Sequence, residues 1–325
     1  MYSEQDIDDA VAAGAISAEA ARGLRQHTAA RQRTQLADEE HFRLVTGFND
    51  IFVVIASVLL LGALYWVAGL VTPWAAPLAV AAASWGLAEY FVRRRRMALP
   101  AIVLLASFVL GAGFTAYRLL PERDVAPLVA ALAAAVHWWR FRVPITPAAG
   151  AGAVVVALLV ALSHVDGLAD MAWPVVLAAG LAVFAWALYC DASDVRRETR
   201  RADVAFWLHL LAAPLLVHPV FTAGGVFEGN LGVLRAVLVL GVFGFLAMVS
   251  LAIDRRALMV SGLGYVIYAG SELLSRTASV ETSFALAALV IGATLLLLSA
   301  LWQRARAQVL RRLPVAVTRR LPPPR

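Results

Sequence analysis

Long apolar segments separated by short polar ones make up most of the chain from residue 48 onward. A helix needs about 20 mostly apolar residues to cross a hydrocarbon core of about 30 Å, because each residue adds about 1.5 Å. Residues that favour turns, such as Pro73, Pro121, Pro144 and Gly167, separate the segments. Ten segments reach or approach the required length: 51–70, 74–92, 99–118, 125–139, 147–163, 172–190, 204–220, 232–253, 257–274 and 283–302. The pattern therefore predicts an all-α fold, a polytopic transmembrane helical bundle of about ten spans, in which the fourth and fifth are short.

Basic residues gather in alternate connections between these segments, and all 28 of them are arginines. Cationic loops stay on the cytoplasmic side of a membrane. With the N-terminus in the cytoplasm, this rule retains every arginine inside except Arg118, Arg123, Arg235 and Arg276. An even number of spans then places both termini in the cytoplasm. The short outer loops exclude a sizeable extracytoplasmic domain.

Four of the predicted hairpins share one plan. In each, an alanine-rich helix ends in aromatic residues, arginines follow, and a second helix returns; the four are residues 84–108, 136–156, 184–211 and 249–270. One explanation of this plan is internal duplication. The other is convergence, because arginines kept on the cytoplasmic side and aromatic residues at the membrane interface produce the same plan in any helical bundle.

Composition agrees with a membrane protein. The 325 residues are 61% hydrophobic and 15% charged, and the mean hydropathy is +0.76. Soluble proteins are about 45–50% apolar and about 25% charged, so this composition excludes a soluble globular domain. The net charge of +6 does not indicate nucleic acid, because the arginines lie between apolar runs rather than on one soluble face. The single cysteine, Cys190, excludes an intramolecular disulfide and a multi-cysteine metal site.

Three regions follow from the pattern: a soluble segment 1–47, the ten-helix bundle 48–303 and a basic tail 304–325. The first has no signal-peptide core, so we expect the first span to act as an uncleaved anchor. Ser3 and Ser17 are placed to begin two short helices and Gly14 to end the first, which predicts a helical hairpin before a juxtamembrane helix. The hairpin is either an arm that docks a protein partner or a cap on the bundle. The tail is expected to be attracted to anionic lipids of the inner leaflet.

The N-terminal segment AVAAGAISAEAARGL, followed by a charged linker and alanine- and leucine-rich spans with RRR-type loops, resembles an uncharacterised family of bacterial membrane proteins. This resemblance implies a bacterial cytoplasmic (inner) membrane protein and implies no particular function. The ten-span topology is also similar to that of drug and metabolite transporters with five-plus-five inverted repeats. The 47-residue N-terminal segment departs from the transporter pattern.

Polar residues within the membrane are costly and usually face the interior of a bundle, so they are candidate sites. In the ninth predicted span, a stripe on one helix face consists of Ser261, Tyr265, Tyr268 and Glu272, with Tyr265 near mid-membrane. Such a stripe binds a polar solute or relays protons, or its hydroxyls simply bond to neighbouring helices.

The third predicted span has a similar face formed by Ser107, Gly111, Thr115 and Arg118. Arg118 and Glu272 are expected at similar depth, which predicts that they pair. The alternatives are a packing seam of small residues and an Arg118 side chain that extends to the headgroups.

In the seventh predicted span, His209 is the deepest ionisable residue, and Pro214 frees the carbonyl of Leu210. This combination indicates a broken-helix site with a histidine that couples to protons, or a neutral histidine bonded across a helix interface. At the end of the second span, Glu89 is one turn from Arg93 and is predicted to pair with it.

The leading interpretation is a transporter of a small solute or lipid. The alternative is a membrane scaffold or signalling component that docks a partner through the N-terminal hairpin. No paired aspartates, HExxH sequence or serine–histidine arrangement occurs in the spans, so we expect no enzyme, and we assign no catalytic, cofactor-binding or metal-binding residue.

Overall fold

The computed structural model describes residues 10–24, 48–167, 171–197, 199–225, 233–260, 262–274, 280–318 and 321–322. Within these residues the chain is helical and contains no strand, as predicted. The longer helices are α3 (Phe48–Gly69), α4 (Ala75–Ala88), α5 (Ala98–Leu119), α6 (Ala126–Phe141), α7 (Thr146–Ser163), α8 (Ala172–Ala192), α9 (Arg200–Ala223), α10 (Val233–Ile253), α12 (Leu263–Leu274), α13 (Val280–Ala300) and α14 (Trp302–Arg311). Shorter elements are the π-helical turn η2 (Glu89–Arg94), which continues α4, the 3₁₀ turn η3 (Arg123–Val125), α11 (Ala257–Val260) and α15 (Val315–Thr318).

Eight helices in the described part are long and apolar enough to cross a membrane, which identifies a multi-pass membrane protein. The other two predicted spans are also helical but shorter. The fourth is the 16-residue α6, and the ninth is divided between α11 and α12. The count of ten spans therefore stays a prediction.

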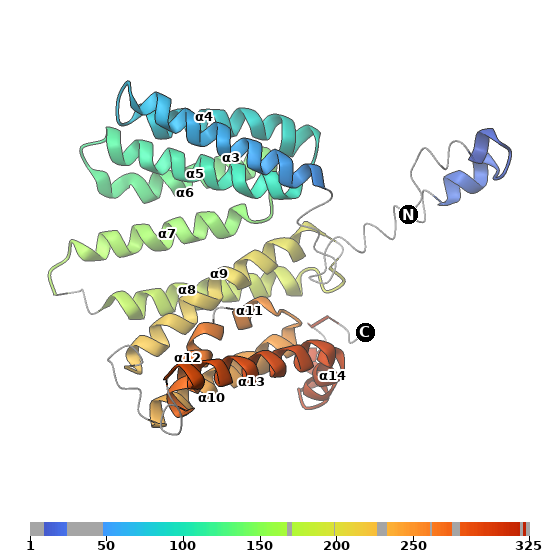
Figure 1. The fold of residues 1–325 in the computed structure, drawn as a ribbon, viewed down its shortest axis with the longest axis vertical. Coiled ribbons are helices and arrows are strands. Elements are labelled where there is room, and N and C mark those ends of the chain that lie inside the picture. Colours follow the sequence, from blue (N-terminus) through green and yellow to red (C-terminus); the bar gives the residue numbers. More distant parts are fainter. Residues whose placement is uncertain are drawn as a thin grey trace.

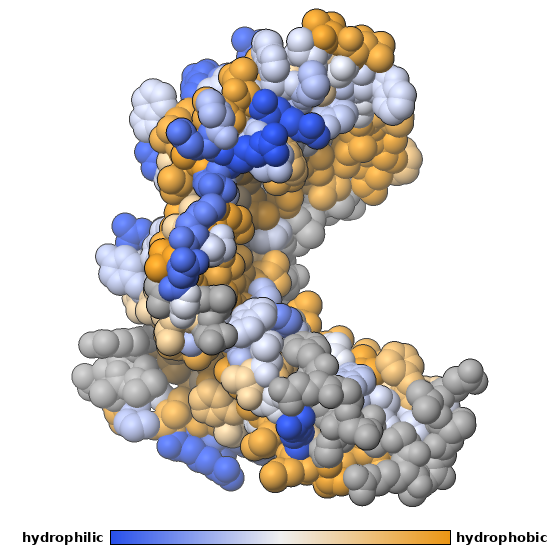
Figure 2. All heavy atoms as spheres, turned by 90° about the vertical axis from the view of Figure 1, so that its left-hand side faces the viewer, coloured by the Kyte–Doolittle hydropathy of each residue, from blue (hydrophilic) through white to orange (hydrophobic). Residues whose placement is uncertain are grey.

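The helices form two lobes (Figure 1). The N-terminal lobe contains α3–α7 and the C-terminal lobe contains α8–α14, with α7 lying beside α8 and α9. Seen along the helices, the molecule is C-shaped, with an open cleft and a largely apolar surface (Figure 2). Helices α3 and α13 bury few of their residues, so most of their apolar side chains are available to lipid.

Glycines allow neighbouring helices to approach closely within each lobe. A Cβ at Gly111 in α5 would lie 2.8 Å from the carbonyl oxygen of Pro77 in α4. A Cβ at Gly180 in α8 would lie 2.9 Å from the backbone of Leu215 in α9. Thr115 donates its hydroxyl to the carbonyl of Gly111 at 2.6 Å, within its own helix. This geometry is the small-residue packing seam anticipated for the third span.

The predicted broken helix at Pro214 is wrong. Helix α9 is continuous from Arg200 to Ala223 through both Pro214 and Pro219. Half of the residues in the apolar stretch of α9 are buried, mostly against α8. This packing stabilises the helix where proline removes a backbone hydrogen bond. The break occurs in the ninth segment instead, after Val260. There, a Cβ on Gly262 would lie 2.9 Å from the ring of Phe243.

The four arginine-rich hairpins share a backbone feature as well as a sequence plan. Among the described residues, positive φ outside glycine occurs at Arg96, Arg142, Arg197 and Asp254, with φ of 55°, 56°, 55° and 58°. Each follows the first helix of one hairpin, where a left-handed residue ends a helix and redirects the chain.

Residues 10–12 and 18–24 are helical, and Gly14 between them has φ of 70°. The Ser17 hydroxyl accepts a hydrogen bond from the backbone N–H of Ala20 at 3.0 Å, as predicted for its capping role. Ser3 and the juxtamembrane segment lie outside the described residues, so the complete hairpin stays a prediction.

We predict that Gly180→Ala lowers the thermal midpoint of the detergent-purified protein, because the new methyl group collides with the backbone of α9. The expected cost is about 1–3 kcal/mol. Gly241→Ala on α10 is the matched control, since a Cβ there meets nothing within 4 Å. Equal midpoints for the two variants would contradict the close approach of α8 and α9.

Candidate functional site

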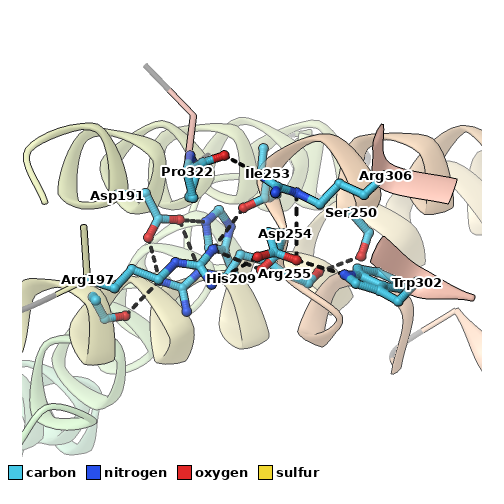
Figure 3. A network of polar contacts seen from close by, with 11 residues as sticks. Asp191, Arg197, His209, Ser250, Ile253, Asp254, Arg255, Trp302, Arg306 and Pro322 are labelled. Atoms are coloured by element: carbon cyan, nitrogen blue, oxygen red, sulfur yellow. Dashed lines mark hydrogen bonds and ion pairs between the residues drawn. The ribbon is translucent and has the colours of Figure 1, made fainter. Parts of the chain in front are cut away.

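A buried network of charged residues occupies the arginine-rich end of the C-terminal lobe (Figure 3). Asp191, at the end of α8, accepts hydrogen bonds from Arg255 Nη2 at 2.5 Å and Nε at 3.2 Å. His209 Nε2 lies 2.9 Å from the same carboxylate. An ionised carboxylate only accepts hydrogen bonds, so the imidazole nitrogen is the donor. His209 is fully buried and Arg255 is 1% exposed, so this ion pair lies in a region from which water is excluded.

Arg255 connects two helix ends besides making the ion pair. Its Nη2 also donates to the carbonyl of Ala202, in the first turn of α9, at 3.0 Å. Its own carbonyl accepts the Ser250 hydroxyl at 2.5 Å. One guanidinium therefore fixes the end of α8 relative to the start of α9.

A second group of contacts surrounds Asp254, the neighbour of Arg255. Trp302 donates its indole N–H to Asp254 Oδ1 at 2.7 Å, and Arg197 Nη1 lies 3.4 Å from Oδ2. Arg197 Nη2 also donates to the backbone carbonyl of Asp254 at 2.9 Å. Arg306 lies 3.7 Å from Asp254 Oδ1 and donates to the carbonyl of Pro322. Burial lowers the pKa of Arg306 from its ordinary value, and the Asp254 carboxylate opposes this effect.

The end of α8 and the start of α9, which the network joins, also border a groove of about 950 Å³ between α6–α7 and α8–α9. We call it the interlobe groove. Its lining is mostly small and aliphatic, with three aromatic side chains and three arginines toward one end. The residues are Ala131, Ala134, Ala135, Trp138, Arg142, Thr146, Pro147, Gly150, Ala151, Val154, Val155, Leu158, Ala179, Ala182, Val183, Trp186, Tyr189, Cys190, Ser193, Arg200, Arg201 and Val204.

The network and the interlobe groove are joined through adjacent residues. Cys190 lines the groove, and Asp191, the next residue, is part of the network. Likewise, Arg201 lines the groove, and Ala202 accepts from Arg255. The buried ion pair therefore sets the position of one wall of the groove.

The ninth-span stripe does not form a shared polar site among the described residues. The Tyr265 hydroxyl lies 2.5 Å from His218 Nδ1 on α9, and its ring packs on Phe221. Tyr268 is exposed, Ser261 lies outside the described residues, and of Glu272 the structure describes only the backbone. The Tyr265 contact matches the interpretation in which hydroxyls bond to neighbouring helices.

The third-span candidates also stay apart from the network. Ser107 is half-buried, Thr115 bonds within its helix, and Arg118 is exposed at the end of α5. The predicted pairing of Arg118 with Glu272 is wrong. Helices α5 and α12 belong to different lobes and lie far apart in Figure 1, because each packs mainly against helices of its own lobe.

Of the predicted residues, only His209 enters the network. The sequence pattern indicates His209 as a candidate but does not indicate its partners Asp191 and Arg255. The available signal was an acidic residue directly after a predicted span, at an end otherwise rich in arginine. The pairing of Glu89 with Arg93 is confirmed at 3.3 Å, and Arg140 of α6 binds the same carboxylate at 2.7 Å.

The described residues contain no group of three or more histidine, cysteine or acidic side chains placed to hold a metal. Comparisons with protein-family models, curated proteins and solved structures find no match. The candidate site is therefore interpreted from its own chemistry.

We predict that Asp191→Asn and Arg255→Gln each destabilise the protein by about 3–5 kcal/mol, because each leaves a buried charge unpaired. Thermal midpoints followed by fluorescence-detected size exclusion measure this loss. Combining Asp191→Asn with Arg255→Met should recover part of it. Asp166→Asn, at an exposed loop residue, is the control and should leave the midpoint unchanged.

Proposed function

We propose that this membrane protein transports an amphiphilic lipid, which enters the interlobe groove from the bilayer. The observation that carries the proposal is the groove itself: about 950 Å³, apolar along most of its length and basic at one end. Ligand sites commonly have volumes of about 300–1,000 Å³ and few polar groups. The lining favours a molecule with an apolar chain and a polar head over a small polar solute.

The polar-solute version of the transporter has less support. It depends on a stripe of polar side chains exposed to water at mid-membrane. Tyr265 instead bonds to His218, and His209 is fully buried against Asp191. Neither Tyr265 nor His209 lines the interlobe groove. The alternative of a scaffold or signalling component, docked through the N-terminal hairpin, is retained as an outcome of the transport test.

The proposal includes a membrane topology. We propose ten spans with both termini in the cytoplasm of a bacterium and the arginine-rich hairpin ends at the inner face of its cytoplasmic membrane. The distribution of arginines supports this orientation, as does the recurrence of one backbone turn in four hairpins at the same end. The basic tail then contacts anionic lipids of the inner leaflet.

Single cysteines in a Cys190→Ser background test this topology. Cysteines at Arg94 and Arg304 should react with an impermeant maleimide only in inverted vesicles or opened cells. Cysteines at Glu122 and Asp166 should react in intact cells. Labelling of positions 94 and 122 from the same side would contradict the proposed hairpin arrangement.

The transport proposal is tested in proteoliposomes with a fluorescent phospholipid whose outer-leaflet fraction is quenched by an impermeant reductant. Wild type should make lipid of the inner leaflet accessible to the quencher. Ala182→Trp, which narrows the interlobe groove at α8, should slow this step about tenfold or more, because the indole ring occupies space that the acyl chains need.

Leu181→Trp is the matched control, since Leu181 is exposed on the adjacent position of α8 and does not line the groove. It should transport as wild type does. Equal rates for the two tryptophan variants would reject the groove as the lipid path. A folded wild-type protein that moves no lipid and co-purifies with a stable partner would favour the scaffold.

A further inference from the structure

We infer that the interlobe groove selects an anionic phospholipid, whose phosphate is bound by Arg142, Arg200 and Arg201. This inference rests on the proposed function, because it assumes that a lipid occupies the groove. It goes further in naming the headgroup chemistry and the residues that recognise it.

The arginines at this end of the molecule fall into two groups, and the first group forms ion pairs. Arg140 binds Glu89 at 2.7 Å, Arg255 binds Asp191 at 2.5 Å, and Arg197 lies 3.4 Å from Asp254. These side chains are buried or half-buried and connect different helices. Their charges are already neutralised, so they are unavailable to a ligand.

The second group is at the mouth of the interlobe groove. Arg142, Arg200 and Arg201 are exposed, and none forms an ion pair with another residue in the part of the chain that the structure describes. Asp203, in the first turn of α9, lies near Arg200 and Arg255 and does not line the groove. Three positive charges thus border the groove, and among the described residues its lining contains no acid.

The backbone holds these arginines in place around the mouth. Arg142 ends α6 in the left-handed conformation, and its guanidinium lies 5.6 Å from the centre of the Trp138 ring. Arg200 and Arg201 begin α9, directly after Thr199, whose hydroxyl accepts the backbone N–H of Arg201 at 3.3 Å. The three arginines therefore border the same groove from both of its walls, Arg142 from α6 and Arg200 and Arg201 from α9.

The composition of the walls changes along the groove in the order that a phospholipid requires. Within one turn of the arginine end of their helices are Trp138 and Tyr189, residue types that favour the headgroup region of a bilayer. Farther in, the lining consists of residues such as Ala135, Val154 and Leu158, which suit acyl chains. Guanidinium groups bind phosphate through paired, charge-assisted hydrogen bonds.

Charge complementarity favours an anionic headgroup over a zwitterionic one. A choline group adds a positive charge next to three arginines, which offsets the attraction of the phosphate. A glycerol headgroup adds none and can donate further hydrogen bonds. We therefore expect phosphatidylglycerol to bind about tenfold more tightly than phosphatidylcholine with the same chains, the difference expected from one additional unfavourable charge contact.

The test measures competition of these two lipids for a tail-labelled fluorescent phosphatidylglycerol on the full-length protein in detergent. Wild type should prefer phosphatidylglycerol, and Arg142→Gln/Arg200→Gln/Arg201→Gln should lose the preference while still binding the labelled chain. Arg94→Gln/Arg311→Gln/Arg312→Gln removes the same charge from exposed arginines outside the groove and should keep it.

Two outcomes overturn the inference: no preference in wild type, or a preference that survives the groove triple variant. Single Arg201→Gln and Arg142→Gln variants replace the triple if its elution profile shows misfolding, and each should lose part of the preference. Ala182→Trp separates this inference from the proposed function. If that variant abolishes lipid binding while the arginine variants keep the preference, only the headgroup assignment fails. If Ala182→Trp binds lipid as wild type does, the proposal that lipid occupies the interlobe groove is wrong, and the headgroup assignment is wrong with it.

Discussion

The Asp191 carboxylate lies where water is excluded, and the arrangement of the C-terminal lobe depends on how its charge is neutralised. A buried ion is tolerated only when partners replace the hydration it has lost. Arg255 and His209 supply these partners from two other elements, and Arg255 also bonds to the first turn of α9. The N-terminal lobe has a less buried counterpart in Glu89, which binds Arg140 of α6. In both lobes an acid at the end of one helix binds an arginine at or just after the end of a later helix.

This constraint also determines where free positive charge is left. A loop arginine in a membrane protein has a topological role whatever else it does, so a high arginine content does not by itself indicate a ligand. The arginines are distinguished by whether they form ion pairs with acidic residues. Arg140, Arg197 and Arg255 hold helices together through ion pairs, whereas Arg142, Arg200 and Arg201 border the interlobe groove, whose described lining contains no acidic residue. The same buried network therefore shapes one wall of the groove and leaves its mouth basic.

The helices were predictable from sequence because length and hydropathy are local properties. Nine of the ten predicted spans each coincide with one helix, if η2 is counted with α4, whereas the ninth falls on α11 and α12. The position of Ser17 also correctly indicates its cap. Partners between helices were not predictable in the same way. Asp191 and Arg255 are 64 residues apart in a chain with several arginines in alternate loops, so spacing alone does not identify the pair. Glu89 was assigned to Arg93 because a helix fixes that distance, and the second partner, Arg140, depends on tertiary packing. Proline likewise indicated a break in α9 that packing against α8 prevents.

The sequence distance between Asp191 and Arg255 has a consequence for biosynthesis. The sixth predicted span is complete well before the ribosome adds Arg255, and at about 5–20 residues per second those 64 residues require roughly 3–13 s. During that interval the carboxylate lacks the guanidinium of Arg255, which also bonds to Ala202 at the start of α9, so this connection between α8 and α9 forms only after residue 255 is made. A nascent chain stopped before residue 255 should therefore expose a polar helix end to the machinery that removes incomplete membrane proteins, while one that has passed this residue should not.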